Sequence, residues 1–306
     1  MNKDKKLIKL KFNENIQDLK QFFAKNGYLC INNLFSKDAI INIRQEICEV
    51  LASEEIICTQ NLLKAIPKSE PYHINSPQSH RITEEVMKRE IIHTLAYDKN
   101  LLNLLEGLLG KPIYPHPNKM FRVCFPSNTK SNYITPPHQD IYYIKGEKDT
   151  FTVWTPLGNY SPFEGSLKLI AGTHRKGFYP ICERQEKQFL RCAIANISEE
   201  DENWLSADCE IGDCLIMHSL TIHSGNQNNS KFLRLSIDYR FSALDGDINE
   251  EQLNPLYFTS NKSWEEISKG WSKNIPIADI PKSLNILPKE TSHEKVLEKL
   301  SIFTKC

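Results

Sequence analysis

Residues 212–241 of the chain read GDCLIMHSLTIHSGNQNNSKFLRLSIDYRF, and this stretch decides the fold. Two runs rich in Ile, Leu, Met, Phe and Tyr, at residues 213–218 and 232–242, flank a segment that contains Gly, Asn, Ser and Lys. Short apolar runs separated by turn-forming residues are typical of antiparallel strands. The stretch therefore predicts two strands of one antiparallel structure, joined by a polar connection.

The same pattern extends upstream to about residue 112. Short runs of Val, Ile, Phe, Tyr and Trp alternate there with Gly, Pro, Asn and Asp, which indicates further strands. They are expected at residues 119–125, 138–144, 150–157 and 166–170. Residues 175–207 interrupt the series as a long insertion. The simplest architecture is mainly β, a sandwich or barrel with flanking helices packed on its outside.

The first hundred residues are predicted to be mostly helical. Apolar residues at intervals of three and four indicate one helix that ends at Gly27 and another that begins after Ser36. The other expected elements are a strand at 28–31, an irregular loop at 66–82 and two helices at 83–98 and 99–110. We expect residues 1–245 to form one domain, with residues 246–306 as a helical or irregular extension packed on it.

Composition narrows the function. The chain has 306 residues, of which 40% are hydrophobic and 25% charged, as in a globular protein. Its 38 basic and 38 acidic residues cancel, so no overall field attracts nucleic acid or a membrane surface, and a small-molecule substrate is expected. Nine cysteines without a CxxC pair argue against a disulfide framework or a thiolate zinc site. The amino terminus lacks the apolar run of a signal peptide, which predicts a cytoplasmic protein.

Side chains that can bind a metal lie in two of the β segments. His138 and Asp140 are two residues apart on a predicted strand, so their side chains should project from the same face. His223, much later in the chain, is the best candidate for a third ligand. Two histidines and one carboxylate are the ligand set of non-haem Fe(II) oxygenases, which keep open positions for a cosubstrate and O2.

A 2-oxo acid cosubstrate also needs a cation for its far carboxylate. Arg234 follows His223 on the same or the next strand, and its planar guanidinium suits bidentate carboxylate binding. Ser236 lies on the same strand face and adds a hydroxyl donor. An HxD triplet alone arises often by chance and could be the polar edge of a sheet, whereas the ordered set of three ligands and Arg234 is more specific.

These residues are part of a longer resemblance. The chain resembles the phytanoyl-CoA dioxygenase (PhyH) branch of the Fe(II)/2-oxoglutarate-dependent oxygenases over roughly residues 16–242. The matching segments are HQD at 138–140, FTVWTPL at 151–157, EGSLKLIAGTHRKG at 164–177 and GDCLIMHSLTIHSGNQN at 212–228, together with Arg234. The resemblance implies a double-stranded β-helix, also called a jelly roll, of the cupin-like kind. It implies His138, Asp140 and His223 as iron ligands and Arg234 as the 2-oxoglutarate anchor.

The resemblance extends to further positions around the cosubstrate. Met120 and Trp154 align with positions that line the cosubstrate pocket in the family, and Gln139 matches the common middle residue of its HxD motif. One departure is that Gly225 stands where the family usually has a serine two residues after the distal histidine, with Ser224 one residue earlier. Ser224 is therefore not assigned as a cosubstrate ligand.

The sequence as a whole predicts an Fe(II)/2-oxoglutarate-dependent dioxygenase that uses O2 to hydroxylate a small metabolite, with release of succinate and CO2. Asp140 supports hydroxylation or another oxidation, since halogenating relatives have a small residue at this position. Two alternatives remain open at this point: a non-catalytic jelly-roll module that binds a metabolite or metal, and a zinc hydrolase that uses the same three ligands. Determinants of the substrate are expected in the loops at 66–82, 126–137 and 175–207.

Overall fold

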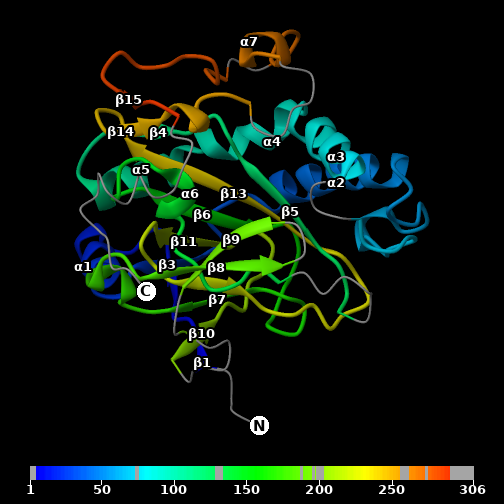
Figure 1. Cartoon of the computed structure of the whole chain (residues 1–306), viewed down its shortest axis with the longest axis horizontal. Helices are drawn as coiled ribbons and strands as arrows, with labels where there is room; N and C mark the ends of the chain where they lie inside the picture. Colours follow the sequence, from blue (N-terminus) through cyan, green and yellow to red (C-terminus); the bar gives the residue numbers. More distant parts are fainter. Residues whose placement is uncertain are drawn as a thin grey trace.

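A computed structural model of the chain shows two β-sheets packed face to face, with helices on the outside (Figure 1). The structure describes residues 5–72, 76–127, 134–186, 189–194, 197, 203–255, 262–272 and 275–289. Trp154 and Met217 of the larger sheet pack against Leu167 and Leu169 of the smaller one, and all four are buried. Apolar side chains between the layers therefore hold the two sheets together.

The larger sheet has the order β2-β3-β11-β6-β13-β4, and β5 also pairs with β13. Its strands are β2 (Lys9–Lys11), β3 (Tyr28–Asn32), β4 (Ile113–Pro115), β5 (Met120–Cys124), β6 (Phe151–Pro156), β11 (Cys214–His218) and β13 (Arg234–Ala243). The smaller sheet has the order β1-β10-β7-β12. Its strands are β1 (Lys5–Lys6), β7 (Leu167–Ile170), β10 (Trp204–Ser206) and β12 (His223–Gly225). The strands expected from the pattern after residue 112 thus form the core, apart from the segment at 138–144.

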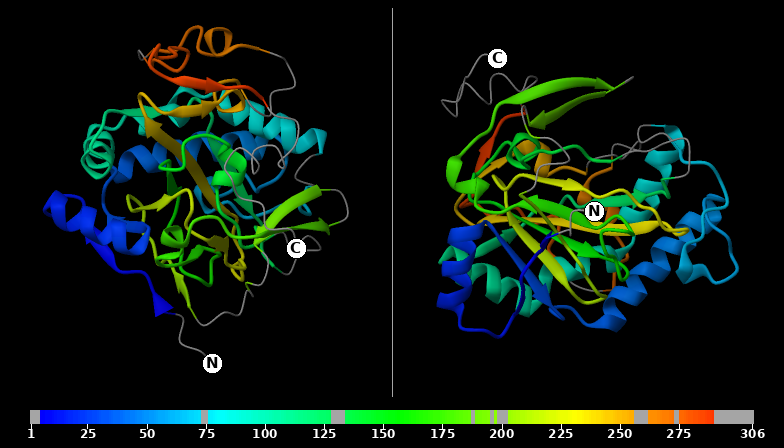
Figure 2. Two further views of the ribbon diagram at one scale, coloured as in Figure 1. Left: turned by 60° about the vertical axis from the view of Figure 1, so that its left-hand side comes forward. Right: turned by 90° about the horizontal axis from the view of Figure 1, so that it is seen from below.

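Helices from the first hundred residues cover the outer face of the larger sheet, where the right-hand view of Figure 2 shows the blue and teal helices along one side. They are α1 (Ile16–Asn26), α2 (Lys37–Ser53), α3 (Pro77–Met87), α4 (Glu90–Thr94) and α5 (Lys99–Leu109), with 3-10 turns η1 (Leu62–Lys64) and η2 (Leu95–Tyr97). As predicted, α1 stops at Gly27, whose backbone has φ 76° and donates its N–H to the Phe23 carbonyl. Glycine adopts this left-handed conformation without steric cost.

Strand β13 has one apolar and one polar face, because successive side chains of a strand point to opposite sides and its apolar and polar residues alternate. All ten of its residues are buried. One face is apolar and packs into the core shared with the helices. It consists of Leu235, Ile237, Tyr239, Phe241 and Ala243. The opposite face, with Arg234, Ser236, Asp238, Arg240 and Ser242, carries charges and hydroxyls. The interior of the sandwich is therefore polar along this strand, which is the requirement for a buried site.

Two segments differ from the prediction. The expected strand at 138–144 is wrong: His138 makes a single bridge, and the chain then turns into a short helix, α6 (Ile141–Ile144). The turn is fixed because the Asp140 carbonyl accepts the amide hydrogens of Tyr143 and Ile144, each at 2.9 Å. The expected loop at 66–82 is also partly wrong, since α3 begins at Pro77 after an N-cap at Ser76. Proline is favoured at the first helical position, so this start has a local cause.

The insertion at 175–207 has its own structure. Strands β8 (Ile181–Glu186) and β9 (Phe189–Ile194) form an antiparallel hairpin, and β10 returns to the smaller sheet. A 3-10 turn, η3 (Thr173–Lys176), leads into the hairpin. The Ile194 amide bonds to the Pro137 carbonyl at 2.8 Å, so the end of the hairpin contacts the segment that precedes the HxD motif.

Some of the described residues after 245 contact the earlier part of the chain, because Ile248, Leu253 and Leu284 form one buried cluster with Tyr114. Strand β14 (Asp247–Asn249) pairs with β15 (Asn285–Leu287), and η4 (Glu250–Gln252) and α7 (Trp264–Ile267) lie between them in sequence. The division into residues 1–245 and 246–306 stays a prediction, and residues 290–306 lie outside the described part. Within the residues that the structure describes, no helix has both the length and the apolar character needed to cross a lipid bilayer.

Candidate metal centre

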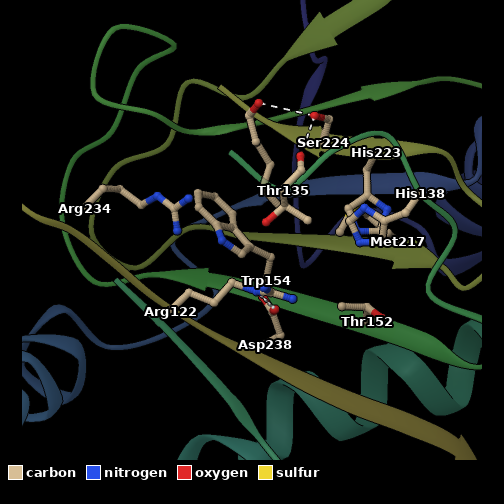
Figure 3. Close-up of a pocket in the computed structure, with 12 residues that line it drawn as sticks. Arg122, Thr135, His138, Thr152, Trp154, Met217, His223, Ser224, Arg234 and Asp238 are labelled. Atoms are coloured by element: carbon tan, nitrogen blue, oxygen red, sulfur yellow. Dashed lines mark hydrogen bonds and ion pairs between the residues drawn. The ribbon is translucent and has the colours of Figure 1, made fainter. Parts of the chain in front are cut away.

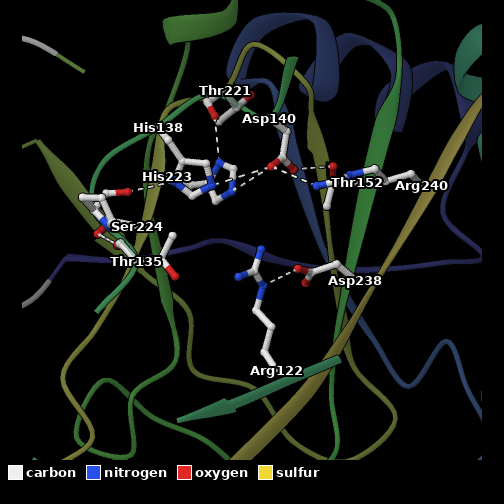
Figure 4. Close-up of polar contacts among 11 residues, drawn as sticks. Arg122, Thr135, His138, Asp140, Thr152, Thr221, His223, Ser224, Asp238 and Arg240 are labelled. Carbon is white, nitrogen blue, oxygen red and sulfur yellow. Dashed lines mark hydrogen bonds and ion pairs between the residues drawn. The ribbon is translucent and has the colours of Figure 1, made fainter. Parts of the chain in front are cut away.

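The structure brings His138, Asp140 and His223 together at one buried point (Figure 4). The Nε2 atoms of His138 and His223 lie 3.6 and 3.9 Å from the Asp140 Oδ1 atom. Two atoms bound to one ion can lie no farther apart than two metal–ligand bonds, roughly 4.2 Å for bonds of about 2.1 Å. The three side chains therefore fit a single divalent ion.

The backbone explains why the two histidines are neighbours. His138 and His223 stand directly opposite each other in an antiparallel bridge, and each donates its amide hydrogen to the other's carbonyl, at 3.0 and 3.1 Å. Side chains opposite each other on such a pair project from the same face, and the ring centroids are 4.1 Å apart. Asp140 reaches the same point from the turn before α6 and not along a continuous strand, so the predicted convergence is present but its predicted cause is not.

Both imidazoles are held in the tautomer that a metal requires. His138 Nδ1 lies 2.8 Å from the Pro136 carbonyl oxygen, and His223 Nδ1 lies 3.0 Å from that of Thr221. A carbonyl oxygen only accepts, so each Nδ1 carries the proton and each Nε2 presents its lone pair to the centre. Burial and the neighbouring His138 lower the pKa of His223 to about 4, which keeps this ring neutral at pH 7.

Asp140 is held ionised by its surroundings. The Thr152 hydroxyl donates to its Oδ2 atom at 2.6 Å, and the Arg240 guanidinium lies 3.4 Å from Oδ1 (Figure 4). Burial alone would raise the pKa of this carboxyl, but the Arg240 guanidinium, with His223 and His138 beside it, holds the pKa well below its usual range. The centre thus presents one carboxylate and two neutral imidazoles, the donor set of a facial Fe(II) site.

A cavity opens beside the three ligands (Figure 3). It is lined by Arg122, Thr135, His138, Thr152, Trp154, Leu167, Met217, His223, Ser224, Gly225, Arg234 and Asp238. Figure 3 places Arg234 and the two histidines at opposite ends of this cavity, with Trp154 between them. The cavity is therefore elongated between a metal centre and a cation.

Arg234 and Trp154 show what the cavity can hold. Arg234 is only 5% exposed and donates to the Gly165 carbonyl and the Ser236 hydroxyl, both at 2.9 Å. Among the described residues, no carboxylate lies within ion-pair distance of it. The buried Trp154 Nε1 has no hydrogen-bond partner in the described part of the chain. A buried cation without a counter-charge is costly, so this end of the cavity fits an anion such as the distal carboxylate of 2-oxoglutarate.

Two other predicted cosubstrate residues are placed differently. The Gln139 amide bonds to backbone groups: Nε2 donates to the carbonyls of Leu220 and Gly177, and Oε1 accepts from the Tyr179 amide. It thereby fixes the turn of the HxD motif against the insertion. Met120 lies on β5 opposite Asp238 and does not line the cavity. The cosubstrate roles of Gln139 and Met120 stay predictions.

Four residues of the site were not predicted from the sequence: Arg122, Thr152, Asp238 and Arg240. Asp238 and Arg240 continue the polar face of β13 that begins with Arg234 and Ser236, so the strand period of two could have indicated them. Thr152 precedes Trp154 by two residues on β6, and the same rule applies. Arg122 depends on the pairing of β5 with β13, which the local sequence does not reveal.

Comparison with known proteins agrees with this geometry. The family model "Phytanoyl-CoA dioxygenase (PhyH)" matches residues 23–236. The 1-deoxypentalenic acid 11-beta-hydroxylase of Streptomyces exfoliatus is 26% identical over 270 residues, which cover 84% of this chain and 89% of that protein. The human peroxisomal phytanoyl-CoA dioxygenase is 22% identical over 230 residues, covering 74% and 68% of the two chains.

Solved structures share the fold. EctD from S. alaskensis with bound Fe has a TM-score of 0.53 at 14% identity and covers 90% of both chains. The epimerase SnoN in complex with Fe3+, alpha ketoglutarate and nogalamycin RO has a TM-score of 0.52 at 17% identity, covering 76% of this chain and 85% of that one. These similarities confirm the predicted mainly β, cupin-like jelly roll with flanking helices. With its family match over residues 23–236 and its His-Asp-His centre, the chain belongs to the phytanoyl-CoA dioxygenase family of non-haem Fe(II)/2-oxoglutarate-dependent oxygenases.

Proposed function

We propose that the protein hydroxylates a small organic metabolite, with O2 and 2-oxoglutarate as cosubstrates and succinate and CO2 as coproducts. His138, Asp140 and His223 hold Fe(II), and Arg234 with Ser236 binds the distal carboxylate of 2-oxoglutarate. The observation that carries the proposal is one cavity with a buried His-Asp-His centre at one end and, at the other, a buried arginine without a counter-charge among the described residues. Bound iron supplies the activation of O2 that is coupled to decarboxylation of the 2-oxo acid.

The surrounding residues orient the reactants and exclude water. Thr152 and Arg240 hold the Asp140 carboxylate, and the carbonyls of Pro136 and Thr221 hold the imidazoles. The apolar side chains of Leu167 and Met217 line the cavity. Such a dry, fixed donor set reduces the rearrangement that the metal centre undergoes during reaction.

A small metabolite is supported by the relatives. Of the two relatives described above, one is named as a hydroxylase of 1-deoxypentalenic acid and the other as a dioxygenase of phytanoyl-CoA, so both names describe oxidation of a small organic molecule. The balanced charge of the chain, with 38 basic and 38 acidic residues, gives no reason to expect a nucleic-acid substrate. A non-catalytic binding module would not need the complete triad together with Arg234.

The test is an anaerobic titration of the apoprotein with Fe(II) and then with 2-oxoglutarate. Binding is monitored through the visible charge-transfer absorption of the chelate. We expect a band in the wild type that is lost in Asp140→Ala and weakened in Arg234→Gln, with succinate formed when O2 is admitted. Arg81→Gln is the matched control, because Arg81 is an exposed arginine paired with Glu54 outside the cavity. A folded wild type that gives neither band nor succinate would refute the oxygenase function and favour a binding module.

A further inference from the structure

Met217 combines an oxidisable side chain with a position beside the metal centre. It lies on β11 and stands opposite Thr152 of β6 in the antiparallel register. Residues opposite each other on such a pair project their side chains from the same face of the sheet, with Cβ atoms about 4.5–5.5 Å apart. Since the Thr152 hydroxyl donates to the Asp140 Oδ2 atom at 2.6 Å, the register places Met217 next to a side chain that contacts a metal ligand.

The Met217 side chain lies inside the sandwich and lines the cavity. The preceding residue, Ile216, packs with the helices on the outer face of the sheet, whereas Met217 packs with Trp154 and Leu167 between the sheets. In Figure 3, Met217 lies toward the two histidines, at the opposite end of the cavity from Arg234. Met217 is only 1% exposed, so its thioether contacts the cavity and almost no bulk water.

A thioether in this position is open to oxidation by the reaction of the site itself. Its sulfur accepts an oxygen atom, which converts methionine into methionine sulfoxide. Of the described residues that line the cavity, Met217 is the one that contains sulfur. A substrate in the cavity would receive the activated oxygen first. The protein with iron, 2-oxoglutarate and O2 but without substrate is therefore the state in which Met217 is vulnerable.

We propose that Met217 is a self-oxidation site, which takes the oxygen atom intended for the substrate when 2-oxoglutarate is consumed without one. This inference rests on the proposed function. The O–O bond breaks, one oxygen atom forms the S–O bond of the sulfoxide, and the other enters succinate. The C1–C2 bond of 2-oxoglutarate breaks and CO2 leaves. The thioether and the 2-oxo acid each lose two electrons, which together reduce O2, so no further reductant is needed.

Oxidation of Met217 changes the lining of the cavity. It replaces an apolar side chain by a polar one, and a buried polar group without a partner is unfavourable. The oxidised protein should therefore unfold at a lower urea concentration than the unmodified protein. A compound that occupies the cavity as a true substrate should receive the oxygen instead and protect Met217, so protection of this residue also identifies substrates.

The test is aerobic incubation of the Fe(II)-loaded protein with 2-oxoglutarate and isotopically labelled O2, with catalase present to remove free peroxide. Peptide fragmentation then locates the label. Met120 is the internal control, because it lies on β5, is half-buried and does not line the cavity. We expect the label at Met217 to exceed that at Met120 about 10-fold or more, since a neighbouring group reacts at a high effective concentration. Methionine sulfoxide reductases should remove the label from the isolated peptide.

Two variants and one treatment separate the routes of oxidation. Asp140→Ala removes a metal ligand and should abolish labelling, although the Met217 thioether is still present. Met217→Leu keeps nearly the same side-chain volume, and the label in the peptide that contains this position should disappear. Hydrogen peroxide without iron should oxidise Met120 before Met217, because Met120 is partly exposed and Met217 is buried.

Equal label at Met217 and Met120 would mean that a diffusing oxidant is responsible and would overturn the assignment. Label at Trp154 in place of Met217 would overturn it as well. If the protein shows the chelate band and forms succinate but leaves Met217 unmodified, this inference is wrong and the proposed function stands. If the wild type gives neither band nor succinate, the proposed function fails, and the self-oxidation site fails with it.

Discussion

The hydroxyl of Thr152 offers the most direct test of how the protein prepares its metal centre. It donates to the Oδ2 atom of Asp140 at 2.6 Å, and both residues are buried. Thr152→Val removes this donor and keeps the shape of the side chain. A hydrogen bond to a charged group contributes about 1.5–3 kcal/mol, which corresponds to roughly 10-fold to 150-fold in a binding constant. Because Arg240 still faces Oδ1, we expect Fe(II) affinity to fall about 10-fold to 100-fold and the site to persist.

The assay is an anaerobic Fe(II) titration of wild type and variant, repeated with Co(II), whose ligand-field spectrum reports the donor set. Thr155→Val is the matched control. Thr155 lies on the same strand, but its buried hydroxyl has no partner in the described part of the chain. This second substitution should leave metal affinity unchanged and be neutral or slightly stabilising, since it removes an unsatisfied polar group.

Equal metal affinity in Thr152→Val and wild type would refute the reasoning. It would mean that Arg240 and the two histidines alone fix the Asp140 carboxylate. An equal loss in Thr152→Val and Thr155→Val would also refute it, because the effect would then come from repacking of β6.

Two further predictions concern buried polar groups outside the ligand set. Burial lowers the pKa of Lys119 to about 7 from its ordinary 10.5. Between pH 7 and pH 10.5 the unfolded chain therefore binds more protons than the folded protein, so the free energy of unfolding of the wild type should rise with pH. Lys119→Met removes the titrating group and should abolish this rise with pH, as measured by urea denaturation at pH 7 and 9.5. A rise of the same size in the variant would contradict the assignment. Gln139→Leu removes three hydrogen bonds to backbone groups and should cost about 2–4 kcal/mol of stability. Urea denaturation checks it, and wild-type stability would show that the amide does not hold the insertion in place.

The faces of strand β13 can be predicted from the sequence, but the partners of its side chains cannot. Its alternation of polar and apolar residues predicts a strand with Arg234 and Ser236 on one face, and the structure confirms both the strand and the shared face. The same period leads on to Asp238 and Arg240, which contact Arg122 and Asp140. Periodicity identifies the face of a strand, whereas the partner of each side chain depends on the register of the neighbouring strand.

The segment after His138 shows why the rest could not be predicted. Ile141, Tyr142 and Tyr143 have high strand propensity, yet they form a helix of one turn. Contacts from distant parts of the chain decide this: the Ile141 amide bonds to the Ser219 carbonyl, and the Gln139 amide bonds to backbone groups of both the insertion and Leu220. Tertiary hydrogen bonds thus override a local preference that spans only a few residues.

The metal centre also lies between the two sheets, so the distances among its side chains depend on how the core spaces the sheets. His223 comes from β12 of the smaller sheet and bridges His138, while Thr152 and Arg240 reach Asp140 from β6 and β13 of the larger sheet. The distance between these groups depends on the apolar layer that includes Trp154. Trp154 therefore contributes to both, because its ring packs between the sheets, and it lies between Arg234 and the two histidines in Figure 3, with no hydrogen-bond partner for its Nε1 among the described residues. A position that lies between the sheets and also lines the cavity beside the triad suits an aromatic side chain with a polar edge, because its ring can pack while its N–H faces a polar space.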